Sequence, residues 1–234
     1  MNKDLMDLYA SRWGVLSSRL SELDSSCYTN PFLISVDEHR LEKANYHIMI
    51  FGQETKGWHD GAGKVRQPSE LMAGYDSFFC QGNFYRGYGR SSFWKAFRYF
   101  EKELAKYESD LNIYFTWNNI NKIGRPNGKT GVDSKARMVE RECFRVIEDE
   151  IQITHPDLVI FLTGPNRDSD IRFSFDEASM NAATPSHSQR AISFVSAPTL
   201  PSTNVRTYHP SYFGGFNRSR RAVLDIVANS ATQR

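Results

Sequence analysis

Hydrophobic positions recur with helical spacing in several parts of the chain. Near the N-terminus they fall three or four residues apart, which predicts an amphipathic helix over about residues 3–24. A second stripe covers residues 92–107. A third follows Asp133, a predicted N-cap, and indicates one long helix to about residue 151. A final helix is expected over about residues 217–229.

Continuous apolar runs lie between these helical patterns and predict buried strands. Three are clear, at residues 47–52, 112–117 and 157–164, and two more are expected at 191–197 and 204–210. Apolar residues that run on without alternation indicate strands covered on both faces, which is typical of parallel sheets. The expected fold is therefore an α/β three-layer sandwich with a mainly parallel sheet of four or five strands. No linker interrupts the pattern, so residues 1–234 are expected to form a single domain.

A long connection, residues 53–91, joins the first strand to the next helix and is rich in glycine and aromatic residues. Structureless connections of this length are uncommon in compact domains and are usually functional. Polar residues also follow each predicted strand, in the segments 52–55, 117–119, 163–168 and 208–211. In parallel sheets the ligand crevice lies beyond the carboxyl ends of the strands, so these segments are expected to meet at one site.

Composition narrows the chemistry of this site. The net charge is only +2, so nucleic-acid binding would need a local basic face. The three cysteines fit neither a zinc site nor an iron–sulfur cluster, and no phosphate-binding loop or serine nucleophile motif follows a strand. We therefore expect no metal and no cofactor. Without a signal peptide or a long apolar segment, a cytoplasmic protein that is not in a membrane is expected.

One carboxylate, one histidine and several amides remain at the predicted strand ends. Amide groups can recognise the edge of a nucleobase, and a carboxylate can orient or deprotonate water. An imidazole can stabilise an anion that forms on a leaving group. This combination suits hydrolysis of the glycosidic bond between a sugar and a nucleobase.

Three short motifs resemble those of the uracil-DNA glycosylase superfamily. Members carry a GQDPYH- or GEAPG-type motif after the first strand, an asparagine in a pattern such as TNxxK, and a late HPSPL-type motif. This chain has GQET, NNINK and HPSYF in the same order, with HPDLVIFLTG at the intervening strand. The resemblance spans roughly residues 30–225. It implies a DNA partner, a monomer and no cofactor.

The resemblance implies a role for each matching residue. Glu54 falls at the position that activates water, and His209 at the one that stabilises the leaving base. Asn119, or Asn118 if the register slips, would read the base. Backbone groups of Gly52 and Gln53 would contact it, and Phe84 or Tyr85 would stack on it. Phe213, beside Ser211 and Tyr212, would fill the gap in the duplex, and phosphates would be bound by Arg86, Arg90, Lys122 and Arg218.

One departure from the family pattern concerns the substrate. The tyrosine of GQDPYH crowds the base at its 5-position, and here Lys56, followed by Gly57, takes its place. The expected function is excision of a damaged or modified pyrimidine, including a bulky 5-substituted base of phage DNA, in repair or antiviral defence. Two alternatives stay open, namely ordinary excision of uracil or another deaminated base, and a module that binds modified bases without catalysis.

Overall fold

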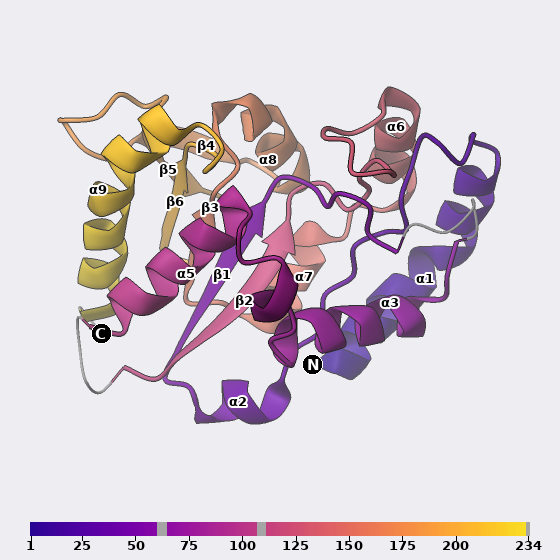
Figure 1. Ribbon diagram of the computed structural model, residues 1–234, viewed down its shortest axis with the longest axis horizontal. Helices are drawn as coiled ribbons and strands as arrows, with labels where there is room; N and C mark the ends of the chain where they lie inside the picture. The colour runs from indigo at the N-terminus through magenta and orange to yellow at the C-terminus, as the bar shows by residue number, and fades with distance from the viewer. Residues whose placement is uncertain (60–64, 107–110, 233–234) are drawn as a thin grey trace.

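A six-stranded, mostly parallel sheet forms the centre of the protein (Figure 1). The computed structural model describes residues 1–59, 65–106 and 111–232. Neighbouring strands follow the order β2-β1-β3-β6-β5-β4. The first four are parallel, β5 is antiparallel to β6, and β4 is antiparallel to β5. Their bounds are Tyr46–Gly52 (β1), Ile113–Asn119 (β2), Leu158–Phe161 (β3), Ser179–Ala182 (β4), Ile192–Ser196 (β5) and Thr203–Thr207 (β6).

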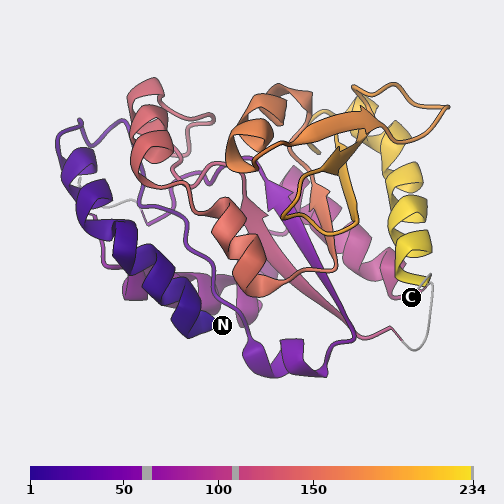
Figure 2. The same ribbon diagram turned by 180° about the vertical axis from the view of Figure 1, so that it is seen from behind.

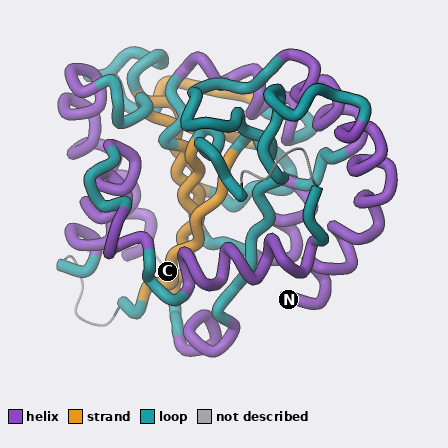
Figure 3. Tube along the Cα trace, turned by 45° about the vertical axis from the view of Figure 1, so that its right-hand side comes forward, coloured by secondary structure: helices purple, strands orange, loops and turns teal. Residues whose placement is uncertain are grey.

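Helices cover both faces of this sheet, which confirms the predicted α/β sandwich. They are Asn2–Ser21 (α1), Glu38–Lys43 (α2), Pro68–Tyr75 (α3), Phe84–Gly87 (α4), Ser92–Leu104 (α5), Ser134–Cys143 (α6), Ile147–Thr154 (α7), Asp168–Ser174 (α8) and Phe213–Thr232 (α9). Helix α5 lies in front of the sheet in Figure 1, next to α9, whereas α7 and α8 lie in front of it in Figure 2. Figure 3 shows the strands as a twisted layer between helices.

The sixth strand, β4, was not predicted. It is a four-residue edge strand in which only Met180 is buried, so it lacks the apolar run that marks the inner strands. By contrast, every residue of β1 is buried. A strand covered on both faces leaves a continuous apolar signal, whereas a short edge strand does not.

The single long helix predicted after Asp133 is wrong. Asp133 does cap a helix, since its side chain accepts a hydrogen bond from the backbone N–H of Lys135. That helix, α6, ends at Cys143, and α7 begins at Ile147. Between them the ring of Phe144 packs 6.2 Å from that of Tyr9 and 5.9 Å from that of Trp13. The apolar stripe continues through the break because all of these segments pack on the same core.

The connection between β1 and α5 is also more ordered than its sequence predicts. It contains α3, a π-helical turn at Asp76–Cys80 and α4. Buried residues, among them Leu71, Tyr75 and Phe79, attach these short helices to the core. The segment is thus a packed wall, and part of it borders the site described below.

The carboxyl ends of the parallel strands meet at one edge, as predicted. Gly52 at the end of β1 pairs in register with Asn119 at the end of β2. Beyond the strands, the Leu162 N–H donates to Phe51 O (2.9 Å) and the Gly164 N–H to Thr207 O (2.9 Å). This edge therefore holds the segments that follow β1, β2, β3 and β6 in a fixed relation.

Candidate functional site

A pocket of about 610 Å³ opens at this edge of the sheet. Its volume is within the range of small-molecule sites. Its polar wall contains Glu54, Asn119 and His209, which follow three different strands, together with Gln53, Lys56, His59 and Ser211. The three residues to which the sequence analysis assigned the main roles therefore line one cavity.

Glu54 occupies this wall with both carboxylate oxygens engaged. Its Oε2 lies 2.8 Å from the Nη2 of Arg167, and its Oε1 accepts a hydrogen bond of 2.8 Å from the Gly131 N–H. The side chain is only 5% exposed. Arg167 was part of the polar segment after β3, but its sequence position gave no sign that it pairs with Glu54, 113 residues away.

The two neighbouring asparagines at the end of β2 have separate roles. The amide of Asn118 faces away from the pocket, where its Nδ2 donates to Glu150 Oε2 (2.9 Å) and its Oδ1 accepts from Lys122 Nζ (2.6 Å). Asn118 Oδ1 also accepts from the Asn119 N–H (2.8 Å). Asn119 lines the pocket and is buried, and its Nδ2 has no partner among the residues that the structure describes. Asn119 is thus the asparagine available to a ligand.

Gly52 makes room for Asn119, and this leads to a prediction. A Cβ on Gly52 would lie 2.5 Å from Asn119 Oδ1 and 3.1 Å from a ring carbon of Phe93. We expect Gly52→Ala to displace one of them and to lower the free energy of unfolding by about 1–3 kcal/mol. Urea unfolding measures this, with Gly14→Ala as the control because a Cβ there meets nothing within 4 Å. Equal stability of Gly52→Ala and wild type would contradict the close approach.

His209 is half-buried in the pocket wall, and its surroundings define its tautomer. The backbone N–H of Ser211 lies 3.2 Å from Nδ1, and the Ser211 hydroxyl lies 2.7 Å from the same atom. A backbone N–H can only donate, so Nδ1 accepts and the neutral ring carries its proton on Nε2. Burial lowers the pKa of His209 to about 4; Glu54 opposes this shift, and the charges of Lys56 and Arg167 add to it. His209 is therefore neutral at physiological pH.

The aromatic residues at the pocket differ from those predicted. Phe84 is buried against Phe79 and Trp94, and Tyr85 extends outward to Glu101 and Arg98, so neither lines the pocket. The aromatic wall consists instead of Trp58, Phe78, Tyr88, Phe93, Trp94 and Trp117.

Phe93 lies at the strand ends, because its ring is 3.1 Å from the place of a Cβ on Gly52 and its centre is 6.2 Å from that of Trp117 in β2. In the sequence it belongs to the apolar stripe of the helix expected over residues 92–107. A signal was nevertheless present. The helix that leads into a parallel strand starts at the carboxyl edge of the sheet, so its first turn, with Ser92 and Phe93, must lie near the site.

Lys122, predicted to bind phosphate, is fully buried. Its Nζ lies 2.6 Å from Glu150 Oε2 and 5.4 Å from the centre of the Phe32 ring. The side chain therefore supports the end of β2 from inside and is not accessible to DNA. Its partner Glu150 is in α7, which sequence spacing does not reveal.

The other predicted DNA contacts lie on the surface. Arg86, Arg90, Arg218 and Ser211 are exposed. Tyr212 and Phe213 are 60% and 63% exposed, which is unusual for side chains of this size. Phe213 is the first residue of α9 rather than part of a loop. The Tyr212 N–H donates to His209 O (2.9 Å), so these two exposed rings follow the pocket residue His209 directly. Insertion of Phe213 into the gap in a DNA duplex stays a prediction.

Gln53 and Lys56 are positioned by the neighbouring segments. The Gln53 amide donates to Thr163 O (2.6 Å), and the carbonyls of Gly52 and Gln53 accept from Ile120 N (3.1 Å) and Asn121 N (2.9 Å). Lys56 is exposed at the pocket, and its backbone forms a bridge with Arg125. Gly52 and Gln53 are thus hydrogen-bonded to the segments that follow β2 and β3, whereas the Lys56 side chain is exposed at the border of the pocket.

The sequence matches no protein-family model and no curated protein. Within the described ranges, no three His, Cys, Asp or Glu side chains come together as metal ligands. No helix in the described part of the chain has the length and apolar character needed to cross a membrane. Function is therefore inferred from the pocket itself.

Proposed function

We propose that this protein is a DNA glycosylase of the uracil-DNA glycosylase superfamily that hydrolyses the N-glycosidic bond of a modified pyrimidine. The observation that carries the proposal is the convergence of Glu54, Asn119 and His209 on one pocket with an aromatic wall. Each comes from a different strand end. Their order along the chain is that of the family motifs described above.

Each residue has chemistry suited to one part of this reaction. The Glu54 carboxylate stabilises the positive charge that develops on the sugar, orients the attacking water and accepts its proton as the new carbon–oxygen bond forms. The base leaves with the electrons of the glycosidic bond, and His209 donates a hydrogen bond from Nε2–H to the resulting anion. A neutral histidine fits this role, since it donates from Nε2 over the whole physiological pH range. The amide of Asn119 recognises the edge of the base.

The pocket also supports the proposal of an enlarged substrate. Enzymes that act on a nucleobase take it out of the helix into a pocket, where it stacks against aromatic side chains. Phe93 lines the pocket next to Gly52 and is the side chain we assign to this stacking. Beyond it the cavity continues along Trp58, Phe78 and Tyr88, and Lys56 stands where the related motif has a tyrosine. This leaves room for a bulky substituent on the 5-position of a cytosine or uracil.

The experiment that tests the function uses DNA with one altered base per duplex. Uracil, hypoxanthine and bulky 5-substituted cytosines are incubated with the protein, and alkali then converts abasic sites to breaks. We expect breaks at the enlarged pyrimidines. Breaks at uracil alone would favour ordinary repair, and tight binding without breaks at any base would contradict catalysis.

Lys56→Tyr tests whether the absence of a tyrosine at this position lets the pocket accept enlarged bases. An aromatic ring at this position should crowd the space next to the 5-position and reduce the rate on enlarged bases by about 10- to 100-fold, the steric effect of overpacking. Lys56→Met is the matched control, because it removes the charge but keeps a slender side chain. Rates on each base are compared with those of wild type. Equal rates for the Tyr and Met variants on enlarged bases would show that this position does not limit the size of the base.

A further inference from the structure

The Glu54 carboxylate is held by a clamp of two donors, the guanidinium of Arg167 and the Gly131 N–H. Each donor lies 2.8 Å from a different carboxylate oxygen. Arg167 is itself only 16% exposed, so this ion pair is largely shielded from water. A shielded ion pair with good geometry restricts a side chain much more than an exposed one.

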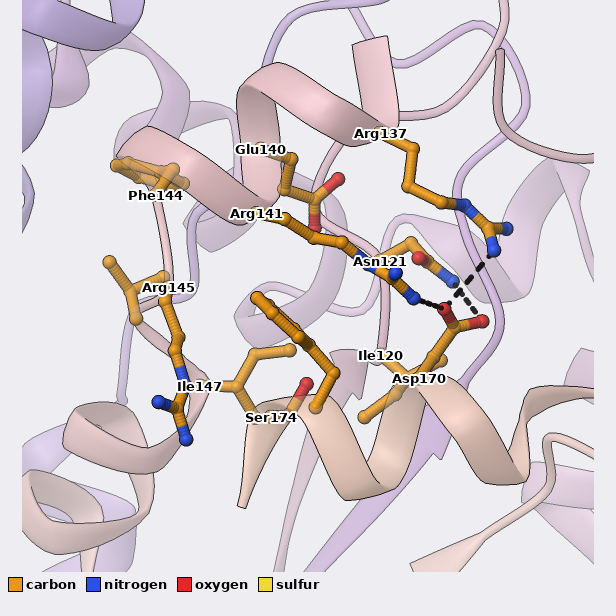
Figure 4. A pocket seen from close by; sticks show the side chains of 12 residues that line it. Ile120, Asn121, Arg137, Glu140, Arg141, Phe144, Arg145, Ile147, Asp170 and Ser174 are labelled. Atoms are coloured by element: carbon orange, nitrogen blue, oxygen red, sulfur yellow. Dashed lines mark hydrogen bonds and ion pairs between the residues drawn. The ribbon is translucent and has the colours of Figure 1, made fainter. Parts of the chain in front are cut away.

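Arg167 also lies close to a buried acidic residue, with which it forms a longer ion pair. Asp170, 3% exposed, has its Oδ2 3.7 Å from the Nε of Arg167. Figure 4 shows the same carboxylate with Arg137 and Arg141, which approach its Oδ1 at 3.2 and 3.0 Å, and with Asn121 on its Oδ2 at 3.5 Å. Two arginines of α6 and an amide from the segment after β2 thus converge on Asp170 in α8, next to the ion pair that Asp170 forms with Arg167.

The two donors to the carboxylate compensate for the length of the Glu54 side chain. The related GQDPYH motif has an aspartate here, and a glutamate adds a methylene and a rotatable bond. A carboxylate that must hold water in one place needs this added freedom removed. A carboxylate has about four lone-pair directions, and the clamp uses two of them. The others remain available to a water molecule and to the sugar.

We propose that Arg167 is a positioning residue that fixes the Glu54 carboxylate for its role in the reaction, with Asp170 holding Arg167 in place. This rests on the proposed function, because the carboxylate is assigned to the attack of water. Arg167 is not among the residues that line the pocket. Its effect is therefore on the rate of base release and not on the affinity for DNA.

The test compares Arg167→Met, which keeps the length but not the charge, with Arg167→Lys, which keeps a cation. We expect the single-turnover rate of base release to fall by about 10²-fold in the Met variant, and less in the Lys variant, with unchanged DNA affinity. Arg172→Met is the matched control, because Arg172 is an exposed arginine of α8, the helix that begins directly after Arg167. A rate like that of the control would overturn the proposal. So would weaker DNA binding with an unchanged rate, since Arg167 would then be a DNA contact.

A second measurement separates this proposal from the proposed function. Urea unfolding of Glu54→Gln, Arg167→Met and the double variant reports their coupling without any substrate. We expect the shifts in the urea midpoint to be clearly non-additive. Additive shifts would overturn the clamp even in an active enzyme. Non-additive shifts in a protein that releases no base would support the coupling between Arg167 and Glu54 and contradict the proposed glycosylase function.

Discussion

Replacing Glu54 by glutamine is expected to slow base release by about 10²- to 10⁴-fold, with DNA binding retained. Glutamine has nearly the same shape and can still accept the hydrogen bond from the Gly131 N–H. It has no negative charge, so it can neither take a proton from water nor stabilise a sugar cation. Binding is retained because the aromatic wall and Asn119 stay in place.

Single-turnover kinetics on the best substrate of the panel measure this rate, and a binding assay on the same duplex measures the affinity. Glu42→Gln is the matched control, since Glu42 is an exposed residue of α2 and does not line the pocket. An unchanged rate in Glu54→Gln would mean that the carboxylate has no part in the reaction. The assignment of the first motif would then be wrong.

Lys122→Met is expected to lower the free energy of unfolding by about 3–5 kcal/mol, the typical result of removing one partner of a buried ion pair. Glu150 would keep a carboxylate without its cation in a fully buried position. Its remaining contacts, the Tyr9 hydroxyl at 2.6 Å and Asn118 Nδ2 at 2.9 Å, are neutral donors. Burial also lowers the pKa of Lys122, against the opposing charge of Glu150.

The double variant Lys122→Met/Glu150→Gln is the informative comparison in urea unfolding. Glutamine removes the unpaired charge but can still accept from Tyr9, so the double variant should be more stable than Lys122→Met alone. The exposed pair Arg221 and Asp225, 3.1 Å apart on α9, offers a control. Arg221→Met should change stability by less than about 1 kcal/mol. A similarly small effect of Lys122→Met would contradict the strong ion pair.

Much of the fold and the polar half of the pocket could be predicted because their signals are local. Continuous apolar runs mark β1, β2 and β3, and their ends necessarily share an edge. Hence Glu54, Asn119 and His209 could be brought together from three distant segments. The edge strand β4 gave no local signal because it has no apolar run, and the break at Phe144 gave none because no glycine or proline interrupts the apolar stripe there.

The errors at the site have a common physical origin. The sequence around Lys122 indicates a solvent-exposed cation in a polar loop, whereas its burial depends on Glu150, which is 28 residues away in α7. Phe84 and Phe93 are both aromatic residues near glycines, and only tertiary packing decides that the first joins the core and the second borders the pocket. Contacts between residues far apart in the sequence decide whether these side chains are buried or border the pocket, and a single sequence does not reveal such contacts.

The pocket is built from two kinds of structure, and this has an evolutionary consequence. The groups assigned to the chemistry stand on the sheet edge, where Gly52 and Gln53 are bonded to the residues after β2. The side of the pocket formed by Lys56, Trp58, Phe78 and Tyr88 belongs to the long connection between β1 and α5. Substitutions in this connection can therefore alter which bases fit the pocket without moving Glu54 or Asn119. Under the proposed function, the range of accepted bases could change, for example when a virus alters the bases of its genome, while the reaction stays the same.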